Sequence, residues 1–287
     1  MTDTVPSPGS IGGYRDLVVQ LTGSSEDEAR LALAEAVATT FGTHIIGVHL
    51  HVLPDILDIT DPLRSSTVRT LLETSEREAD AAFGRLESRL SKLAPSHELR
   101  RLHGLAPDVA VELAQVARLA DLFIGTRPYG DPQGRYRIEE EVLFNSGRGC
   151  LFVPPGGTPH RRFDTVLIAW DNTREAARAV AEAMPLLVRA TAVRLVHVAS
   201  TWDDGRDPAR ELSGIVGHLR RHGVYPETLI VPFAGDTGEQ IEQVAHQQAA
   251  DLIVMGAYGR MRLIELIFGG ATRAILRRAT LPVLMAH

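Results

Sequence analysis

Four glycines near the C-terminal end of the chain have the spacing of an anion-binding turn. Gly256 and Gly259 follow the apolar run Asp251–Met255, and Gly269 and Gly270 precede a stretch with helical periodicity. Glycine tolerates positive φ and lets backbone N–H groups approach an anion, while the N-terminal end of the following helix favours negative charge. Ligands of open α/β sheets bind beyond the carboxyl ends of the strands, where this turn would lie. The pattern favours a phosphate ligand, although glycines that only shape a turn have the same spacing.

Several arginines accompany this turn. Arg260 and Arg262 stand beside the glycines and could neutralise phosphate charge. Arg277 and Arg278 need no ligand, because cations near a helix C-terminus complement the helix dipole. We therefore expect only Arg260 or Arg262 to meet a ligand.

Two histidines offer a weaker candidate for a metal site. His49 and His51 stand two residues apart on a predicted strand, so they share a face, and Asp55 and Asp58 follow closely. Imidazole and carboxylate groups are zinc ligands. His197 matches His49 in the second half of the chain, which favours a structural role such as capping a strand end. The sequence therefore predicts no metal site.

Common catalytic signatures are missing from the sequence. The only lysine, Lys92, lies in a predicted helix, and no G-x-x-x-x-G-K-[ST] occurs, which excludes a P-loop NTPase. A G-x-S-x-G elbow is absent, which disfavours an α/β-hydrolase. The Ser-Gly-Gly-Gly type of loop found in adenylating enzymes is absent after either predicted first strand. Cys150 is most simply a buried small hydrophobe. We predict a protein that is not an enzyme.

The composition is that of an ordinary globular protein. The chain has 287 residues, enough for two domains that each bury a core, and 44% of them are hydrophobic. A formal charge of −6 argues against general nucleic-acid binding. The polar start Met1–Gly13 lacks the pattern of a signal peptide, and no apolar run approaches a membrane span. With one cysteine and no such segments, we expect a cytoplasmic protein that binds neither nucleic acid nor membranes.

The two halves of the chain repeat one order of segments. Each half opens with an apolar run, continues through an Ala-rich helical stretch and a β-branched strand, and later passes from a helix into a strand through Ala-Asp. The matched pairs are Asp16–Gln20 with Asp164–Trp170, Ile45–Val52 with Val193–Val198, Glu112–Gly125 with Ile241–Gly256, and Cys150–Pro154 with Pro282–Ala286.

This alternation of strands and helices predicts the fold. We expect two tandem doubly wound α/β domains, each a five-stranded parallel sheet with helices on both faces. The Pro- and Gly-rich link Pro154–Arg162 separates predicted domains at 14–157 and 163–287. The first half also carries an extra segment, Leu53–Ser66, before a long charged helix that reaches about Leu93. We favour a simple insertion there over a lid.

The second half resembles the universal stress protein family. The resemblance lies in Gly256, two residues, Gly259, nine residues, Gly269, then an Ala-x-x-x-Leu helix and a terminal PVLMAH strand. The strand Val166–Trp170 followed by Asp171 resembles the opening strand and acidic turn of that family. The first half is similar through its order of segments and its SGR-x-x-L-F-V-P ending. The whole chain thus resembles a tandem universal stress protein with a Rossmann-like, nucleotide-binding fold.

The resemblance implies a set of residues for ATP, with Mg²⁺ when it is bound. Asp171 would accept a hydrogen bond from the adenine amino group, and Val198 would form an apolar wall for the base. Trp170 would either stack on the base or fill the rim of the core. The full set is Ala169, Trp170, Asp171, Val198, Met255, Gly256, Tyr258, Gly259, Arg260, Gly269, Gly270, Ala271 and Thr272.

Two departures from the family pattern affect this expectation. Gly270 stands where the family has Ser or Thr, which removes a hydrogen bond to phosphate worth about 1–2 kcal/mol, or about tenfold in affinity. Thr272 and backbone amides could replace part of it. In the first half, Pro128 and Pro132 follow the fourth strand, and Thr22 or Ser24 stands in the place of Asp171. Because proline withdraws backbone N–H donors, we predict that the first half does not bind nucleotide in the same way.

The resemblance implies a non-catalytic adenine-nucleotide-binding module that acts in a stress response through its second half. The alternative is an interaction or scaffold protein whose nucleotide site has decayed. Slow ATP hydrolysis lacks support, since no lysine or evident carboxylate is paired with the glycine-rich turn. The resemblance also implies that Cys150–Pro154 and Pro282–Ala286 pair antiparallel, so that the halves form an internal pseudo-dimer. A further homodimer stays open.

Overall fold

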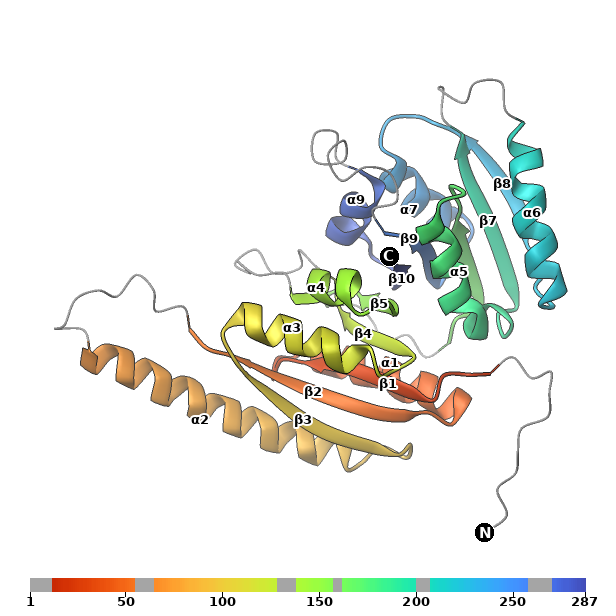
Figure 1. The fold of residues 1–287 in the computed structure, drawn as a ribbon. Coiled ribbons are helices and arrows are strands. Elements are labelled where there is room, and N and C mark those ends of the chain that lie inside the picture. Colours follow the sequence, from red (N-terminus) through yellow and green to blue (C-terminus); the bar gives the residue numbers. More distant parts are fainter. Residues whose placement is uncertain (1–11, 55–64, 128–137, 157–161, 200–206, 258–269) are drawn as a thin grey trace, which may run out of the picture.

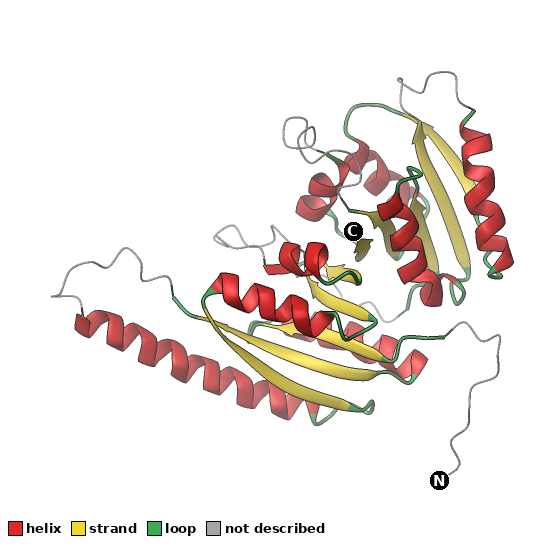
Figure 2. Cartoon of the chain, viewed as in Figure 1, coloured by secondary structure: helices red, strands yellow, loops and turns green. Residues whose placement is uncertain are grey.

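The structure is an α/β fold in which helices cover both faces of one long sheet (Figures 1 and 2). The computed structural model describes residues 12–54, 65–127, 138–156, 162–199, 207–257 and 270–287. No helix within these ranges combines the length and the apolar content needed to cross a bilayer.

Strand and helix alternate through the described chain in the predicted order. The first half contains β1 (Asp16–Leu21), α1 (Asp27–Phe41), β2 (His44–Val52), α2 (Ser65–Leu90), β3 (His97–Gly104), α3 (Ala106–Ala117), β4 (Leu122–Thr126), α4 (Ile138–Asn145) and β5 (Gly149–Val153). The second half contains β6 (Thr165–Ala169), α5 (Arg174–Leu187), β7 (Ala192–Ala199), α6 (Pro208–Arg221), β8 (Glu227–Pro232), α7 (Thr237–Gln247), β9 (Leu252–Gly256), α9 (Ala271–Arg278) and β10 (Val283–Ala286).

The ten strands form a single sheet with the order β3-β2-β1-β4-β5-β10-β9-β6-β7-β8. Neighbours within each half are parallel, and β5 meets β10 antiparallel at the centre. At this seam Leu151 is paired with Leu284, and Cys150 with Met285. The structure therefore contains the antiparallel pairing that the family resemblance implied. Counted outward from the seam, the strand order of the first half recurs in the second, so each strand in one half has a counterpart in the other.

The core is divided by sheet face and not by half of the chain. On one face α1, α2, α5 and α6 pack over the sheet, and their buried side chains form one cluster that runs through both halves. The other cluster lies under α3, α4, α7 and α9 and also runs through both halves. The expectation of a separate core for each half is therefore wrong, because the β5–β10 seam joins the two. Buried on both faces, the central strands are almost continuously apolar, as parallel strands usually are.

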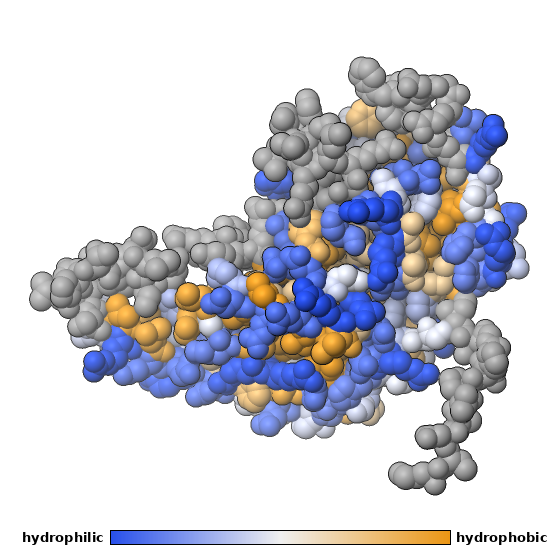
Figure 3. Space-filling view, in the orientation of Figure 1, coloured by the Kyte–Doolittle hydropathy of each residue, from blue (hydrophilic) through white to orange (hydrophobic). Residues whose placement is uncertain are grey.

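Hydrogen bonds outside the sheet also join the halves. The Tyr14 hydroxyl donates to the carbonyl oxygen of Glu182 over 2.7 Å, and the Glu182 carboxylate accepts from the backbone N–H of Gly149 over 3.2 Å. The Arg127 guanidinium donates to the carbonyl oxygen of Ala279 over 3.0 Å. The face seen in Figure 3 carries hydrophilic residues along the outer side of α2, while hydrophobic residues show in small groups between elements.

Candidate functional site

The candidate site lies at the carboxyl ends of β6, β7 and β9. After β6 the chain enters α5 on one face of the sheet, whereas α7, which leads into β9, packs on the opposite face. The space between β6 and β9 is thus a topological switch point, the place where open α/β sheets bind ligands. At the end of β6, Ala169 is paired with Val196 of β7 on one side and with Met255 of β9 on the other.

The structure places the described members of the predicted set on this edge. β6 ends at Ala169 and is followed by Trp170 and Asp171. Val198 lies near the end of β7, and β9 ends with Met255 and Gly256. Gly270, Ala271 and Thr272 form the start of α9. The remaining predicted residues, Tyr258, Gly259, Arg260, Arg262 and Gly269, lie outside the described residues.

Asp171 belongs to a tight turn between β6 and α5. Its Oδ1 accepts from the Thr173 hydroxyl over 2.6 Å and from the Thr173 backbone N–H over 3.2 Å. The same hydroxyl accepts from the backbone N–H of Ala176 and so caps α5. Between them Asn172 has φ 58°, a left-handed conformation that asparagine tolerates better than most residues. The turn holds the exposed Asp171 carboxylate at the mouth of the switch point. The sequence analysis did not single out Thr173, although a Thr preceding a helical stretch is a recognisable N-cap.

Trp170 is a core residue in this structure. It is 8% exposed and packs in the cluster under α1, α2, α5 and α6. Its carbonyl oxygen lies 3.0 Å from Nδ1 of the buried His197 on the neighbouring strand. This contact supports the expected structural role of His197 as a cap on a strand end. The structure therefore favours the core role of Trp170 over stacking on a ligand.

Gly256 permits a close approach between two elements. A Cβ atom at this position would lie 2.5 Å from the backbone nitrogen of Ala176 and 2.7 Å from the carbonyl carbon of Glu175. The N-terminal end of α5 therefore packs directly on the end of β9, and any side chain at residue 256 would separate them. The sequence analysis assigned this glycine to a ligand, and the described contacts give it a packing role as well.

Glu175 is a buried carboxylate at this junction that sequence reasoning missed. It is 3% exposed and forms an ion pair with Arg174. Burial raises the pKa of Glu175, but the hydrogen bond from Arg174, a backbone N–H and the charges of Arg174 and His287 outweigh burial and hold that pKa below its usual range. A charged Glu175 is thus held near the N-terminal end of α5, where the helix dipole stabilises it.

The start of α9 has the features of an anion-binding helix end. The first N–H groups of a helix have no acceptor within that helix, and the first turn of α9 contains no acidic residue. Gly270 occupies the N-cap with φ −50° and ψ 154° and supplies no side-chain cap. That conformation is open to any residue, so glycine is not required there by its backbone angles.

The corresponding turn of the first half is filled by its own side chains. By the strand registers, Thr22 occupies the position in the first half that Asp171 occupies in the second. Gly23, with φ 78°, is likewise equivalent to Asn172. The Asp27 carboxylate accepts from the backbone N–H groups of Thr22 over 2.9 Å and Gly23 over 2.7 Å. Arg30, 1% exposed, pairs with that carboxylate. A carboxylate therefore already uses the turn amides.

In α4, the first-half helix that corresponds to α9, carboxylates of the chain itself offset the positive end of the helix dipole. The first turn of α4 contains Glu139, Glu140 and Glu141. Counting from the paired residues of β5 and β10, Glu139 is the counterpart of Thr272, the second residue of α9. The Gln20 side chain donates to the Glu139 carboxylate over 2.6 Å and accepts from the backbone N–H of Thr126 over 3.1 Å. Acidic residues thus occupy the helix end where a phosphate would bind.

The group of two histidines and two aspartates considered as a weak metal candidate is described only in part. His49 packs against the ring of Phe83, with 6.0 Å between ring centroids, and Asp55 and Asp58 lie outside the described residues. His51 instead lies beside Glu76 of α2 and His103 of β3.

Comparison with known proteins identifies a family and relatives by sequence. Residues 162–287 match the family model described as the Universal stress protein family. A universal stress protein of Synechocystis sp. is 27% identical over 149 residues, which are 50% of this chain and 49% of the relative. A universal stress protein of Methanocaldococcus jannaschii is 32% identical over 75 residues, or 26% of this chain and 45% of the relative. The chain spans about half the length of the curated relatives it matches.

Solved structures resemble the chain over nearly its whole length. A universal stress protein from Archaeoglobus fulgidus matches with a TM-score of 0.74 and 16% identity, covering 94% of this chain and 95% of that one. A functionally unknown protein from Pseudomonas aeruginosa matches with a TM-score of 0.59 and 16% identity, covering 94% and 92%. At these identities the likeness concerns the fold alone. Residues 162–287 are thus a universal stress protein family domain by sequence, and the whole chain has the fold of a solved universal stress protein.

Proposed function

We propose that the chain is a tandem universal stress protein whose second half binds an adenine nucleotide, with ATP as the leading candidate, and whose first half does not. In this proposal the protein is not an enzyme but a module that changes its shape or its partners when nucleotide is bound during a stress response. It acts in the cytoplasm, and its two halves form an internal pseudo-dimer through the β5–β10 seam.

The observation that carries the proposal is the contrast between two corresponding helix ends. The first turn of α9 has no acidic residue, whereas the first turn of α4 has three. An anion gains from the dipole and N–H groups of α9, but it would be repelled at α4 by the carboxylates already there. The family match to residues 162–287 supports the same choice of half.

The described residues also fit the base of an adenine nucleotide. Asp171 is exposed, and the structure uses only its Oδ1 within the turn, so Oδ2 can accept from an exocyclic amino group. Val198 and Met255 offer apolar side chains on the two strands that flank β6. When bound, the nucleotide would supply phosphates to Gly270, Ala271 and Thr272, and Mg²⁺ would accompany ATP.

Two features of the described residues support binding without hydrolysis. The buried carboxylate there, Glu175, is paired with Arg174, and the only lysine, Lys92, lies between α2 and β3. Transfer of a phosphoryl group needs positioned cations and a group that orients the attacking water. We therefore propose binding without turnover.

A second candidate is an interaction protein whose nucleotide site has decayed. Three observations favour it: Asp171 stabilises its own turn, Trp170 is packed in the core, and Gly270 lacks the hydroxyl of the family pattern. In that case the residues of the family's nucleotide pattern serve only to maintain the fold.

Calorimetric titration of the full chain with ATP, ADP and AMP separates the two candidates. We expect ATP to bind at one site per chain. Asp171→Asn keeps an oxygen acceptor for Thr173 but presents an amide group to the adenine amino group, so the affinity should fall about tenfold. Ser24→Ala, in the corresponding turn of the first half, is the matched control and should leave the affinity unchanged. Absence of binding by all three nucleotides at millimolar concentration contradicts the proposal and favours the interaction protein.

A further inference from the structure

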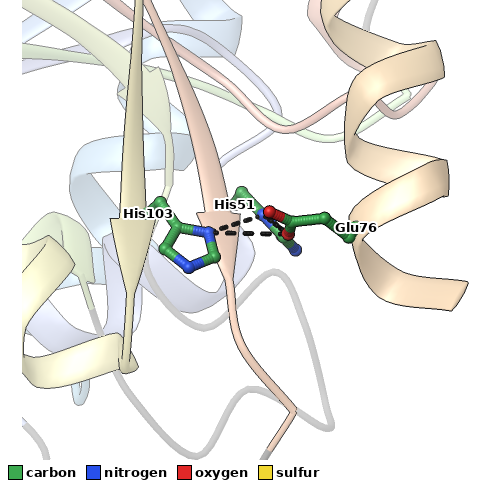
Figure 4. A group of neighbouring side chains, drawn as sticks. All are labelled: His51, Glu76 and His103. Atoms are coloured by element: carbon green, nitrogen blue, oxygen red, sulfur yellow. Dashed lines mark hydrogen bonds and ion pairs between the residues drawn. The ribbon is translucent and has the colours of Figure 1, made fainter. Parts of the chain in front are cut away.

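Three side chains from separate elements converge at the outer edge of the first half (Figure 4). His51 lies on β2, His103 lies on β3, and Glu76 lies on α2, which packs over these strands. His51 and His103 are paired across the parallel strands, so their side chains share the face that α2 covers. In Figure 4 both imidazole rings and the carboxylate point toward one another.

The separations among the three ligand atoms are those of a metal coordination sphere. His51 Nδ1 lies 2.9 Å from His103 Nδ1 and 3.2 Å from Glu76 Oε2, and His103 Nδ1 lies 3.8 Å from the same oxygen. Zinc bonds of about 2.0–2.2 Å at tetrahedral angles place neighbouring ligand atoms about 3.3 Å apart. The three measured separations bracket that value.

Hydrogen bonding alone leaves this cluster poorly satisfied. Both Nδ1 atoms approach the same carboxylate oxygen, yet the short contact between them requires one nitrogen to be the acceptor. The lone pair of that acceptor then faces an anionic oxygen. A cation placed among the three atoms turns all three lone pairs into favourable contacts.

An outer hydrogen bond orients His51 for this role. Its second ring nitrogen, Nε2, lies 2.9 Å from the hydroxyl oxygen of Ser75. Histidines that ligate a metal usually donate their other ring N–H to such a partner, which fixes the ring and its tautomer. His51 is 5% exposed, so packing also holds its ring in place.

Access and charge at the cluster are also suitable. The side chains of His103 and Glu76 are 46% and 53% exposed, so an ion and a water can reach the ligand atoms. The nearby Arg101 guanidinium donates to Asp80 over 2.7 Å, which offsets its repulsion of a cation.

We propose that His51, Glu76 and His103 bind a divalent transition-metal ion, Zn²⁺ in the first place, with water as the fourth ligand. Two imidazole nitrogens and one carboxylate suit zinc and its neighbours, and they disfavour Mg²⁺ and Ca²⁺, which take oxygen ligands. The ion fastens α2 to the β2–β3 edge of the sheet. This site is independent of the switch point in the second half.

Calorimetric titration of the tag-free full chain with Zn²⁺ tests the proposal. We expect one equivalent to bind, and the thermal unfolding temperature to rise with Zn²⁺ concentration, because an ion that binds the folded state stabilises it. Mg²⁺ at the same concentration should do neither. His103→Gln and Glu76→Gln each remove one ligand at a partly exposed position, so the fold should persist while the affinity for Zn²⁺ falls at least about a hundredfold. Ser75→Ala removes only the outer hydrogen bond and should cost about tenfold.

A second histidine pair provides the matched control. His218 and His222 lie at the end of α6 with ring centroids 4.6 Å apart and are exposed. The double variant His218→Gln/His222→Gln should retain the full Zn²⁺ affinity and the thermal shift. The proposal is overturned if the parent binds no Zn²⁺ at millimolar concentration, if His103→Gln and Glu76→Gln bind as the parent does, or if the α6 variant loses the ion.

Discussion

At the scale of single residues, the two halves differ in where they place carboxylates. Asp27 accepts from the turn amides of the first half, and Glu139 stands where the second half has Thr272. In both places a carboxylate of the chain itself occupies a position that could hold an external anion. An internal carboxylate can thus use the same kind of N–H donors that an external anion would use.

Glu139 gives the first half a measurable dependence of stability on pH. Burial raises the pKa of Glu139, while the hydrogen bonds from Gln20 and a backbone N–H and the charge of Arg30 lower it by less. The contribution of Glu139 to stability is therefore fully present below the ordinary glutamate pKa and is lost as pH rises through the higher value of the folded state. We expect Glu139→Gln to be more stable than the parent at neutral pH.

Urea unfolding of both proteins across the pH range checks this expectation. The advantage of Glu139→Gln should shrink as pH falls below the ordinary glutamate pKa, since the parent is then protonated in both states. The same change at the exposed Glu87 of α2 should alter stability by no more than about 0.5 kcal/mol at any pH. A Glu139→Gln variant that is less stable than the parent at neutral pH contradicts the assignment.

Gly270 is the residue at which the proposed nucleotide site departs from the family pattern. Its backbone angles suit serine, whose hydroxyl would supply both an N-cap for α9 and a donor to phosphate. We expect Gly270→Ser to bind ATP about tenfold more tightly, measured by calorimetry. Gly270→Ala adds a Cβ without the hydroxyl and is the control. Equal affinities for the serine and alanine variants would show that the hydroxyl does not meet phosphate.

At the scale of elements, the junction between β9 and α5 sets the shape of the candidate site. The end of β9 contacts the first turn of α5. Thr173, the N-cap of α5, also holds the Asp171 carboxylate in the preceding turn. The position of the carboxylate therefore depends on a backbone contact between two elements that are more than seventy residues apart.

Gly256→Ala tests that contact. The added Cβ would overlap backbone atoms of α5, which cannot rotate away as a side chain can. We expect a loss of about 1–3 kcal/mol in the free energy of unfolding, measured in urea. Gly84→Ala is the matched control, because a Cβ there meets nothing within 4 Å and alanine favours a helix, so stability should rise by about 0.5–1 kcal/mol. Equal stability of Gly256→Ala and the parent would mean that α5 does not pack so closely.

Elements were easier to predict from sequence than their contacts. Periodicity and the internal repeat predict the alternation of strands and helices, and the long helix expected from Ser66 to about Leu93 is found at Ser65–Leu90. Similarity of the two sequence segments matched Gly125 with Gly256. The strand registers instead make Gly125 equivalent to Met255. A one-residue offset of this kind cannot be seen without the pairing of neighbouring strands.

The histidine cluster shows the same limit more sharply. His51 and His103 stand 52 residues apart in sequence, and only the register of β2 against β3 makes them neighbours. Sequence spacing instead grouped His51 with His49, Asp55 and Asp58. For the candidate site, by contrast, the family motif predicted that Asp171, Met255, Gly256 and Gly270 lie at strand ends and a helix start, where the structure has them. Strand ends and helix starts are the features that a motif encodes.

At the scale of the whole molecule, the β5–β10 seam makes one sheet from two repeated halves. The seam buries Leu151, Leu284, Cys150 and Met285 and contributes to both core clusters. It also removes an open edge from each half, since an unpaired strand edge is a template for unwanted association. Among the described strands, β3 and β8 form the two ends of the sheet.

The register of the seam can be tested with the single natural cysteine. Met285 is the antiparallel partner of Cys150, and both side chains lie in the cluster under α3, α4, α7 and α9. Directly opposed residues of antiparallel strands have Cα separations that allow a disulfide. We expect Met285→Cys, refolded under oxidising conditions, to form a disulfide with Cys150 and show no free thiol after denaturation.

The neighbouring position provides the control for this experiment. Leu284 faces the opposite side of the sheet, in the cluster with Leu151. Leu284→Cys should therefore retain two free thiols under the same treatment. A disulfide in Leu284→Cys but not in Met285→Cys would shift the seam by one residue and reverse the faces of β10.

The antiparallel seam has a consequence for how the two halves can change over generations. Strands of the first half run opposite to those of the second, so the carboxyl ends of the two parallel sets lie at opposite edges of the sheet. The turn at Thr22 and the turn at Asp171 therefore lie at opposite edges of the sheet. A substitution at one edge therefore leaves the groups at the other edge in place, so the first-half turn could take on a different chemistry without disturbing the nucleotide site proposed for the second half.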